Sequence, residues 1–275
     1  MTFPAVAAFF CVGSVAAFFC VRHAEAPFAL VDAEKRSNSS IAEKRSYCKN
    51  TSRMGGNLEK RLIDVSHTVE HEMVTYKGLP APIICDWMSR EASHARYAEG
   101  TEFQIGKIEM VGNTGTYIDS PFHRYVNGKD LSELPLESVA NLECLVVRVP
   151  TGTVAIDDIP LSKTLVRGKA VLIHTGWDRH WRTDTYFENH PHLTERAADW
   201  LASAGAAIVG IDSFNIDSVS TGARPVHTVL LGRDIPIVEH MRGLDALPDS
   251  GSRFFAVPVK VKAFGTFPVR AFGMV

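Results

Sequence analysis

Residues 113–123 read Asn-Thr-Gly-Thr-Tyr-Ile-Asp-Ser-Pro-Phe-His, a run of oxygen-bearing side chains that ends in a histidine. Asn113, Tyr117 and Asp119 all occupy odd positions, so on a β-strand their side chains would project from one face. The proline that follows turns the chain, so that His123 can return towards the same face. A metal held by such groups polarises water or a carbonyl, and a nearby imidazole moves the proton. The stretch therefore predicts a site for metal-assisted hydrolysis.

Apolar patterns around this stretch predict a series of β-strands. Short continuous apolar runs are typical of strands that are buried on both faces, and alternating apolar residues indicate a strand with one buried face. Turn-forming glycine, proline and asparagine residues separate these segments. The alternating pattern covers residues 103–118, and the other expected strands are 62–67, 145–149, 170–173, 207–211 and 254–259.

One longer helix is expected among these strands. Residues 194–204 place several apolar side chains on one helical face, and Thr194 and Gly205 supply residues suited to its start and its end. A shorter helix or a turn is expected at 239–241. Strands mixed with single helices, without a sustained repeat, indicate one mixed α/β domain over residues 62–275.

The first 61 residues differ in composition from the rest of the chain. Residues 1–21 are almost wholly apolar, and the polar stretch that follows contains Ala-Glu-Lys-Arg-Ser twice, at 33–37 and 42–46. If residues 1–26 are a signal peptide, the protein is secreted; if the apolar run stays uncleaved, it anchors the protein in a membrane. If translation starts at Met54, the protein is cytoplasmic. In each case this segment has too little apolar periodicity to fold alone.

Composition excludes several classes of function. The net charge is −2 and no basic stripe is visible, so nucleic acid is not an expected partner. Five cysteines without a Cys-x-x-Cys pair argue against a disulfide framework and against a cysteine zinc knuckle. The sequence contains no Gly-x-Ser-x-Gly elbow, Walker loop or Gly-x-Gly-x-x-Gly, which argues against the commonest serine hydrolases, NTPases and dinucleotide-binding proteins.

Residues 113–123 resemble the signature His-x-Gly-Thr-His-x-Asp-x-Pro-x-His of the cyclase family of metal-dependent hydrolases. The best-known members of this family are the bacterial kynurenine formamidases, and isatin hydrolases are also similar. The resemblance implies a swivelling β/β/α fold and a homodimer or larger homo-oligomer. It extends over nearly all of residues 62–275, and further matching motifs lie at 127–129, 134–136, 211–213, 224–227 and 265–270.

The resemblance also implies a divalent metal, usually zinc or manganese, that activates water for attack on the amide, lactam or ester carbonyl of a small molecule. Asp119, His227 and Glu239 match the family's metal ligands, and His123 matches its general acid and base. The expected reaction is that of an arylformamidase on a substrate of the N-formylkynurenine type. A lactone or cyclic amide, such as an isatin-type ring, is a further substrate class that the resemblance allows.

This chain departs from the signature at two positions, because Asn113 and Tyr117 stand where the family has histidine ligands. In a first interpretation, a harder ion such as manganese or magnesium also uses the weaker Asn113 oxygen; Tyr117 would ligate only as a phenolate. Alternatively, either residue donates a hydrogen bond to the developing oxyanion. In a second interpretation, another histidine fills the gap, and the candidates are His67, His71 and His174.

In a third interpretation the site has lost its metal. The domain is then a non-catalytic binder of small molecules, or it performs metal-free chemistry centred on His123. The persistence of Asp119, His123, His227 and Glu239 together favours a functional site over this alternative.

Overall fold

The computed structural model describes residues 60–275. The predictions about a signal peptide, a membrane anchor, the repeated pentamer and a start at Met54 lie outside the described residues. Within residues 60–275, no helix is both long enough and apolar enough to cross a bilayer.

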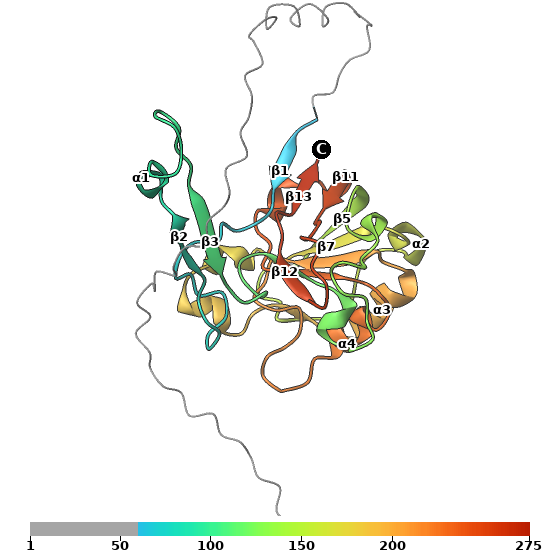
Figure 1. The fold of residues 1–275 in the computed structure, drawn as a ribbon. Helices are drawn as coiled ribbons and strands as arrows, with labels where there is room; N and C mark the ends of the chain where they lie inside the picture. The colour runs from blue at the N-terminus through green and yellow to red at the C-terminus, as the bar shows by residue number, and fades with distance from the viewer. Residues whose placement is uncertain (1–59) are drawn as a thin grey trace, which may run out of the picture. The chain divides into compact units, whose positions relative to one another are not determined.

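A nine-stranded mixed sheet forms the centre of the domain (Figure 1). In spatial order the strands are β1 (Leu62–Asp64), β13 (Phe272–Met274), β11 (Ser250–Phe255), β5 (Leu142–Arg148), β7 (Ala170–His174), β9 (Ile208–Ile211), β10 (Ile237–Glu239), β4 (Tyr117–Asp119) and β12 (Thr266–Pro268). The strands β5, β7, β9 and β10 run parallel to one another, whereas β4 and β12 join antiparallel beyond β10. The strand β4 therefore lies between β10 and β12, although it is far from both in the sequence.

Both faces of this sheet are covered by apolar side chains, but only one face carries the longer helices. The helices α3 (Glu195–Ala204) and α4 (Pro225–Leu231) pack on the face that includes Ile211 and Ile237. The opposite face, which includes Ile118 and Val238, packs against loops and the carboxy-terminal segments. Each face thus has its own hydrophobic core, and the domain resembles the layered α/β arrangement that the sequence predicts. The shorter helix α2 (Lys163–Val166) contacts α3, and so does β8 (His192–Leu193), which pairs with β6 (Ala155–Ile156) in a separate two-stranded sheet.

Most of the predicted elements are present, and the differences have local causes. The runs at 170–173 and 207–211 form β7 and β9, and α3 ends at Gly205 in a left-handed conformation with φ 77°. Thr194 precedes α3 as predicted, but its hydroxyl donates to Asp157 at 2.7 Å and not to the helix backbone. The strand expected at 254–259 is shifted, because β11 ends at Phe255.

Two predictions of secondary structure are wrong. Residues 103–118 do not form one strand, because β3 (Ile105–Glu109) and β4 belong to different sheets. Residues 239–241 do not open a helix or a turn after Glu239; instead Glu239 is the last residue of β10. Short strands such as β4 and β10 have three residues each, which is too few for a clear alternating pattern in the sequence.

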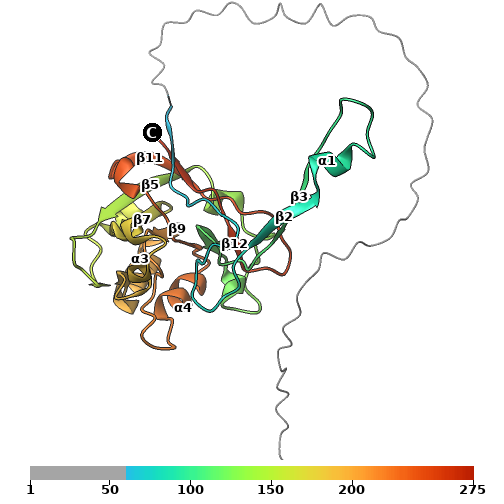
Figure 2. The ribbon, with the colours of Figure 1, turned by 90° about the vertical axis from the view of Figure 1, so that its left-hand side faces the viewer.

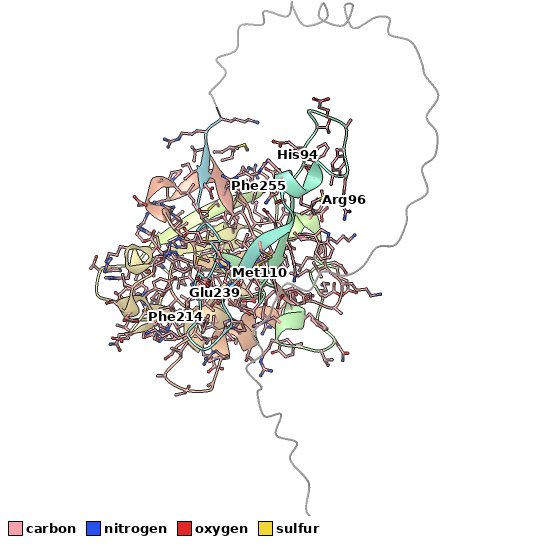
Figure 3. All side chains as sticks on the ribbon, turned by 60° about the vertical axis from the view of Figure 1, so that its left-hand side comes forward. His94, Arg96, Met110, Phe214, Glu239 and Phe255 are labelled. Atoms are coloured by element: carbon pink, nitrogen blue, oxygen red, sulfur yellow. The ribbon has the colours of Figure 1, made fainter. Side chains whose placement is uncertain are left out.

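A two-stranded arm projects from the domain and consists of β2 (Ile83–Met88), the short helix α1 (Arg90–Ser93) and β3. Figures 1 and 2, which view the molecule from directions 90° apart, both show it leading away from the main sheet. Figure 3 shows His94 and Arg96 near its far end, well away from Phe214 and Glu239 in the body. Large apolar side chains along the arm are exposed to solvent, with Trp87 at 73% and Ile108 at 56%.

Candidate active site

The pairing of β4 with β10 and β12 places four polar side chains on one face of the sheet. Asp119 lies opposite Thr266 on β12, and Tyr117 lies opposite Glu239 on β10. Residues directly opposite in an antiparallel pair point to the same face. The intervening residues Ile118, Val238 and Phe267 face the other core. The polar side chains therefore face the side of the sheet that α3 and α4 cover.

The helix α4 brings His227 to this group, and Asp217 fixes its orientation. The Asp217 carboxylate accepts hydrogen bonds from the backbone N–H groups of Val226 at 2.8 Å and His227 at 3.0 Å, in the first turn of the helix. The same carboxylate lies 2.6 Å from the His227 ring Nδ1, which donates to it. The His227 Nε2 is then directed towards Asp119 Oδ2 at 3.7 Å and Glu239 Oε1 at 3.8 Å. A carboxylate behind a histidine is the usual support of a metal-ligating imidazole.

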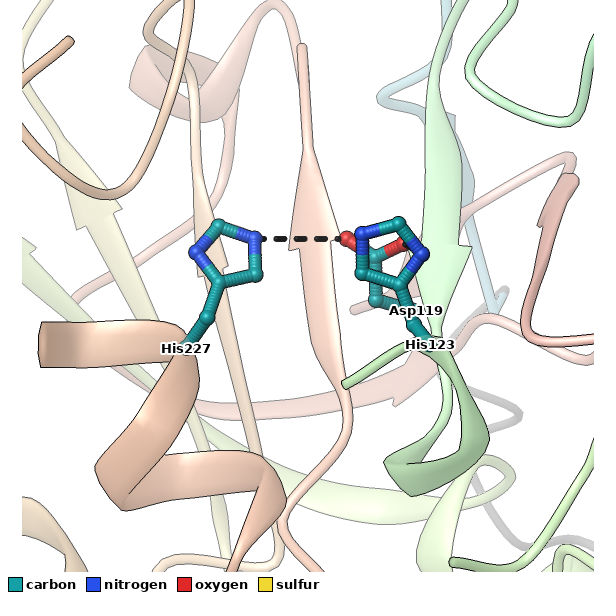
Figure 4. A group of neighbouring side chains, drawn as sticks. All are labelled: Asp119, His123 and His227. Atoms are coloured by element: carbon teal, nitrogen blue, oxygen red, sulfur yellow. Dashed lines mark ion pairs between the residues drawn. The ribbon is translucent and has the colours of Figure 1, made fainter. Parts of the chain in front are cut away.

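His123 approaches the group from the short helix η1 (Pro121–His123), as the sequence predicts. Its side chain is 36% exposed, and its Nδ1 lies 2.7 Å from the Thr266 hydroxyl. That hydroxyl donates its single hydrogen to Asp119, so it accepts a hydrogen bond from the His123 Nδ1–H. The His123 Nε2 is thereby left as the basic nitrogen. Asp119, His123 and His227 each place a ligand atom within 4.8 Å of the others (Figure 4).

The buried carboxylates around His227 concentrate negative charge. Asp119, Asp217 and Glu239 are at most 1% exposed. Burial lowers the pKa of His227, but the carboxylates of Asp119, Asp217 and Glu239 outweigh this effect and raise it to about 10. Burial also raises the pKa of Glu239, against the opposing effect of the His227 charge. Three buried acids beside one imidazole leave excess negative charge, which a bound cation would neutralise.

One atom of this group lacks a hydrogen-bond partner. Asp119 Oδ2 is buried and, within residues 60–275, no group donates a hydrogen bond to it. Glu239 is satisfied differently: its Oε1 accepts from the Ile216 N–H and its Oε2 from the Tyr117 hydroxyl, both at 2.6 Å. A buried carboxylate oxygen without a donor is costly unless a cation neutralises it. The donor set of Asp119, His227 and Glu239 therefore fits a divalent ion that accepts both oxygen and imidazole ligands.

The structure places the two residues that depart from the signature in different surroundings. Tyr117 is fully buried, and burial raises its pKa far above the usual range, so it stays a phenol that donates to Glu239. This geometry makes it a support for Glu239 and leaves no hydroxyl proton for an oxyanion. Asn113 lies in the bend before β4, not on the strand as its spacing suggests, and it lines the cavity beside the site.

None of the three histidines proposed to fill the gap lines this cavity. His67 stacks on Trp181 with ring centroids 3.9 Å apart. The His71 Nδ1 accepts a hydrogen bond from the Ile84 N–H at 3.1 Å, at the base of the arm. His174 lies at the end of β7, with its Nδ1 3.0 Å from the Arg148 guanidinium. Each histidine thus makes a contact away from the cavity lining, which argues against the interpretation that another histidine replaces the two missing ligands.

The site opens into a cavity of about 590 Å³, and the sequence did not predict several residues around it. Asp217 and Thr266 hold His227 and His123, and of these two supports only Thr266 lies in a segment that matches the family. Asp217 is not the N-cap of α4 and lies eight residues before its first residue, so no local pattern marks it. Tyr76, Lys77 and Asn215 also line the cavity and belong to none of the matching motifs.

Comparisons with known proteins agree with this arrangement. Residues 63–218 match the family model named Cyclase. The chain belongs to the cyclase family. It is 28% identical over 223 residues to the kynurenine formamidase of Bordetella avium (strain 197N), an alignment that covers 77% of this chain and 97% of that protein.

Solved structures of the family share the fold of this chain. Isatin hydrolase A from Labrenzia aggregata superposes with a TM-score of 0.63 at 20% identity, covering 78% of this chain and 94% of that one. A structure described as a potential metal-dependent hydrolase with cyclase activity also has a TM-score of 0.63, at 22% identity, covering 78% and 98% of the two chains. The expected cyclase-type α/β fold is therefore confirmed.

The donor set predicts a metal-dependent gain in thermal stability. Addition of Mn²⁺ or Zn²⁺ at about one hundred times its Kd should stabilise the folded protein by ~2.7 kcal/mol, a rise of roughly 5–10 °C in Tm. Asp119→Asn should lose most of this rise, because it removes the carboxylate charge that faces the ion. Differential scanning calorimetry measures the effect.

Asp234→Asn is the matched control, because Asp234 is an exposed partner of Lys129 outside the cavity. The control should retain the full metal-dependent rise. An equal rise in the Asp119→Asn and wild-type proteins would show that the ion binds elsewhere.

Proposed function

We propose that this protein is a metal-dependent amide hydrolase of the arylformamidase type, with an N-formyl aromatic amine as its substrate. The cyclase family and its kynurenine formamidase and isatin hydrolase members identify a hydrolase of C–N bonds other than peptide bonds. The observation that most directly supports a bound metal is the buried Asp119 Oδ2, which has no hydrogen-bond donor among residues 60–275 and lies 3.7 Å from the His227 Nε2. An N-formylkynurenine-type substrate is the first to test, since the curated relatives carry that activity in their name.

Asp119, His227 and Glu239 are the residues that would hold the ion, and the Asn113 amide is a further oxygen donor on the cavity lining. A bound divalent ion would supply Lewis-acid activation of water and of the carbonyl group. Tyr117 and the Ile216 N–H hold the two Glu239 oxygens, and Asp217 holds the His227 ring. These supports fix the geometry before substrate enters, which is what a catalytic site requires.

His123 is placed to move the proton. Its Nδ1–H is held by Thr266, which in turn is held by Asp119, so the neutral ring presents its Nε2 as a base. Nε2 would accept a proton from the attacking water and return it to the nitrogen of the leaving amine. Both histidines line the cavity, but His123 is 36% exposed and can contact substrate, whereas His227 is 7% exposed and is held by Asp217. This division assigns His227 to binding and His123 to proton transfer.

A non-catalytic binder remains the competing function, and the replacement of two family histidines by Asn113 and Tyr117 is the observation that favours it. The two functions differ in one measurable result. The enzyme releases formate and arylamine, whereas the binder would hold an N-formyl arylamine without converting it.

Self-association through the arm is a further part of the proposal. The strands β2 and β3 form a two-stranded sheet with exposed Trp87 and Ile108, and an isolated pair of strands is only marginally stable in water. Residues 83–109 carry five acidic and three basic side chains. The loop 257–264 exposes Val257 and Val259 beside two lysines, so the same loop of a second copy is complementary to the arm in charge and apolarity.

Removal of His123 should abolish turnover without unfolding the protein. With Mn²⁺ or Zn²⁺ present, His123→Ala should lower kcat on N-formylkynurenine by ~10²–10⁴-fold, because proton transfer is lost. Absorbance of the released arylamine measures the rate. His94→Ala on the arm is the control and should retain wild-type turnover, because the His94 side chain is paired with Glu102 at the surface and lies outside the cavity lining. Full activity of His123→Ala would exclude this mechanism, and wild-type binding without turnover would favour the binder.

Introduction of two aspartates on the apolar face of the arm should dissociate the oligomer. The wild-type protein should elute as a dimer or a larger species in size-exclusion chromatography with light scattering, and the double variant Trp87→Asp, Ile108→Asp should elute as a monomer. Burying two carboxylates without partners opposes association. Val126→Asp is the control, because Val126 is 83% exposed and lies outside the arm. A monomeric wild-type protein, or an unchanged double variant, would contradict the proposal.

A further inference from the structure

Tyr76 lines the same cavity but matches no motif of the family signature. Its hydroxyl oxygen accepts a hydrogen bond from the Asn215 side-chain Nδ2 at 2.6 Å. The orientation of the Asn215 amide is fixed on its other side, because its Oδ1 accepts from the Asp217 N–H at 2.9 Å. Asn215 can therefore only donate to Tyr76. The Tyr76 hydroxyl oxygen is the acceptor in this bond, so its own proton is still available for donation.

No acceptor among residues 60–275 takes that proton. The only hydrogen bond of the Tyr76 hydroxyl in the described part of the chain is the one that it accepts from Asn215. Tyr76 therefore differs from the other tyrosine of the cavity, Tyr117, whose proton is donated to Glu239. It also differs from Tyr186, which is buried outside the cavity lining with its hydroxyl 3.0 Å from a ring nitrogen of His240.

The position of Tyr76 is fixed by packing and by the backbone. Its ring packs on Phe214 with centroids 4.5 Å apart. The preceding residue, Thr75, is buried and accepts a hydrogen bond from the Gly115 N–H at 2.8 Å, which ties this loop to the signature segment. Gly115 adopts φ 64°, and a Cβ there would lie 3.0 Å from Val69 of the same loop. The loop therefore packs closely on the signature segment that carries Asp119 and His123.

We infer that the Tyr76 hydroxyl is the hydrogen-bond donor to the carbonyl oxygen of the substrate. This inference rests on the proposed hydrolase function, because it concerns the same cavity and the same bond. As water adds to the carbonyl carbon, the C=O bond becomes a C–O bond and its oxygen gains negative charge. A fixed neutral donor strengthens its hydrogen bond at that stage, which lowers the barrier more than it favours substrate binding. Tyr76 keeps its proton throughout, and His123 performs the proton transfer.

This inference gives Tyr76 the role of oxyanion donor that one interpretation of the sequence gives to Asn113 or Tyr117. Both side chains carry a phenol on the cavity lining, but only Tyr76 has a proton that is not already donated. The guanidinium of Arg224 also lines the cavity, and its Nη1 donates to the carbonyl oxygens of Ser218, Thr221 and Ala223. Those bonds hold the 218–224 loop beside α4 and commit Nη1 to the protein.

The test compares Tyr76→Phe with the wild-type protein on N-formylkynurenine in the presence of the metal. Loss of one oxyanion donor should lower kcat by ~10²–10³-fold, and KM should change less than about threefold because the ring and its packing remain. Tyr97→Phe, on the exposed arm, is the matched control and should keep wild-type kcat. The metal-dependent rise in Tm should be the same in all three proteins, since Tyr76 does not hold the ion.

Two results would overturn the inference while leaving the proposed function in place. One is a kcat of Tyr76→Phe close to that of the wild type. The other is a fall in kcat that comes with a lost metal-dependent rise in Tm, which would assign Tyr76 to the metal site and not to the carbonyl. A wild-type protein that binds metal but does not hydrolyse the N-formyl substrate would instead reject the proposed function, and this inference with it.

Discussion

The antiparallel pairing of β4 with both β10 and β12 is the constraint on which the site depends. It sets Asp119 opposite Thr266 and Tyr117 opposite Glu239, so that their side chains share one face. A shift of one residue in either register would turn these polar groups into the opposite hydrophobic core and bring Ile118 to the cavity. The apolar packing of Ile118, Val238 and Phe267 in the opposite core therefore helps to fix which side chains face the cavity.

The second requirement is positive charge among buried acids. Asp119, Asp217 and Glu239 surround one imidazole, and the chain supplies no lysine or arginine ion pair to any of the three within residues 60–275. Such a cluster is destabilising unless a proton on His227 or a bound cation neutralises it. The supports of the cluster agree with this conclusion. Asp217 holds the His227 ring, and the Ile216 N–H and the Tyr117 hydroxyl hold the two Glu239 oxygens. His227 Nε2 then lies 3.7 Å from the unpartnered Asp119 Oδ2 and 3.8 Å from Glu239 Oε1. The cluster therefore lowers the stability of the unoccupied domain, and a bound cation would restore it.

The sequence predicts the chemically reactive residues better than it predicts their supports. Asp119, His123, His227 and Glu239 follow from motif order, and the structure brings them together. The supports could not be predicted, because they are contacts between distant segments: Thr266 lies 147 residues from Asp119, and Asn215 lies 139 residues from Tyr76. Neither contact has a local pattern. The same holds for the role of Tyr117, whose partner Glu239 lies 122 residues away.

Secondary structure shows the same division. Long apolar runs such as those of β7 and β9 were recognisable, since burial on both faces leaves a continuous signal. The three-residue strands β4 and β10 and the seven-residue helix α4 are positioned by tertiary packing and leave little periodicity. The exposed arm misled the prediction, because the apolar residues at 103–110 suggest a strand with one buried face, whereas every residue of β3 is exposed.

The most direct test of the account is a crystal structure of the wild-type protein grown with Mn²⁺, with anomalous scattering measured to locate the ion. We predict an anomalous peak within bonding distance of Asp119, His227 and Glu239, ~2.0–2.3 Å from the ligand atoms, with the Tyr76 hydroxyl on the open side of the cavity. A peak at another position, or an empty cavity with an imidazolium bridging the three carboxylates, would contradict the claim that this face of the sheet is built to hold a metal.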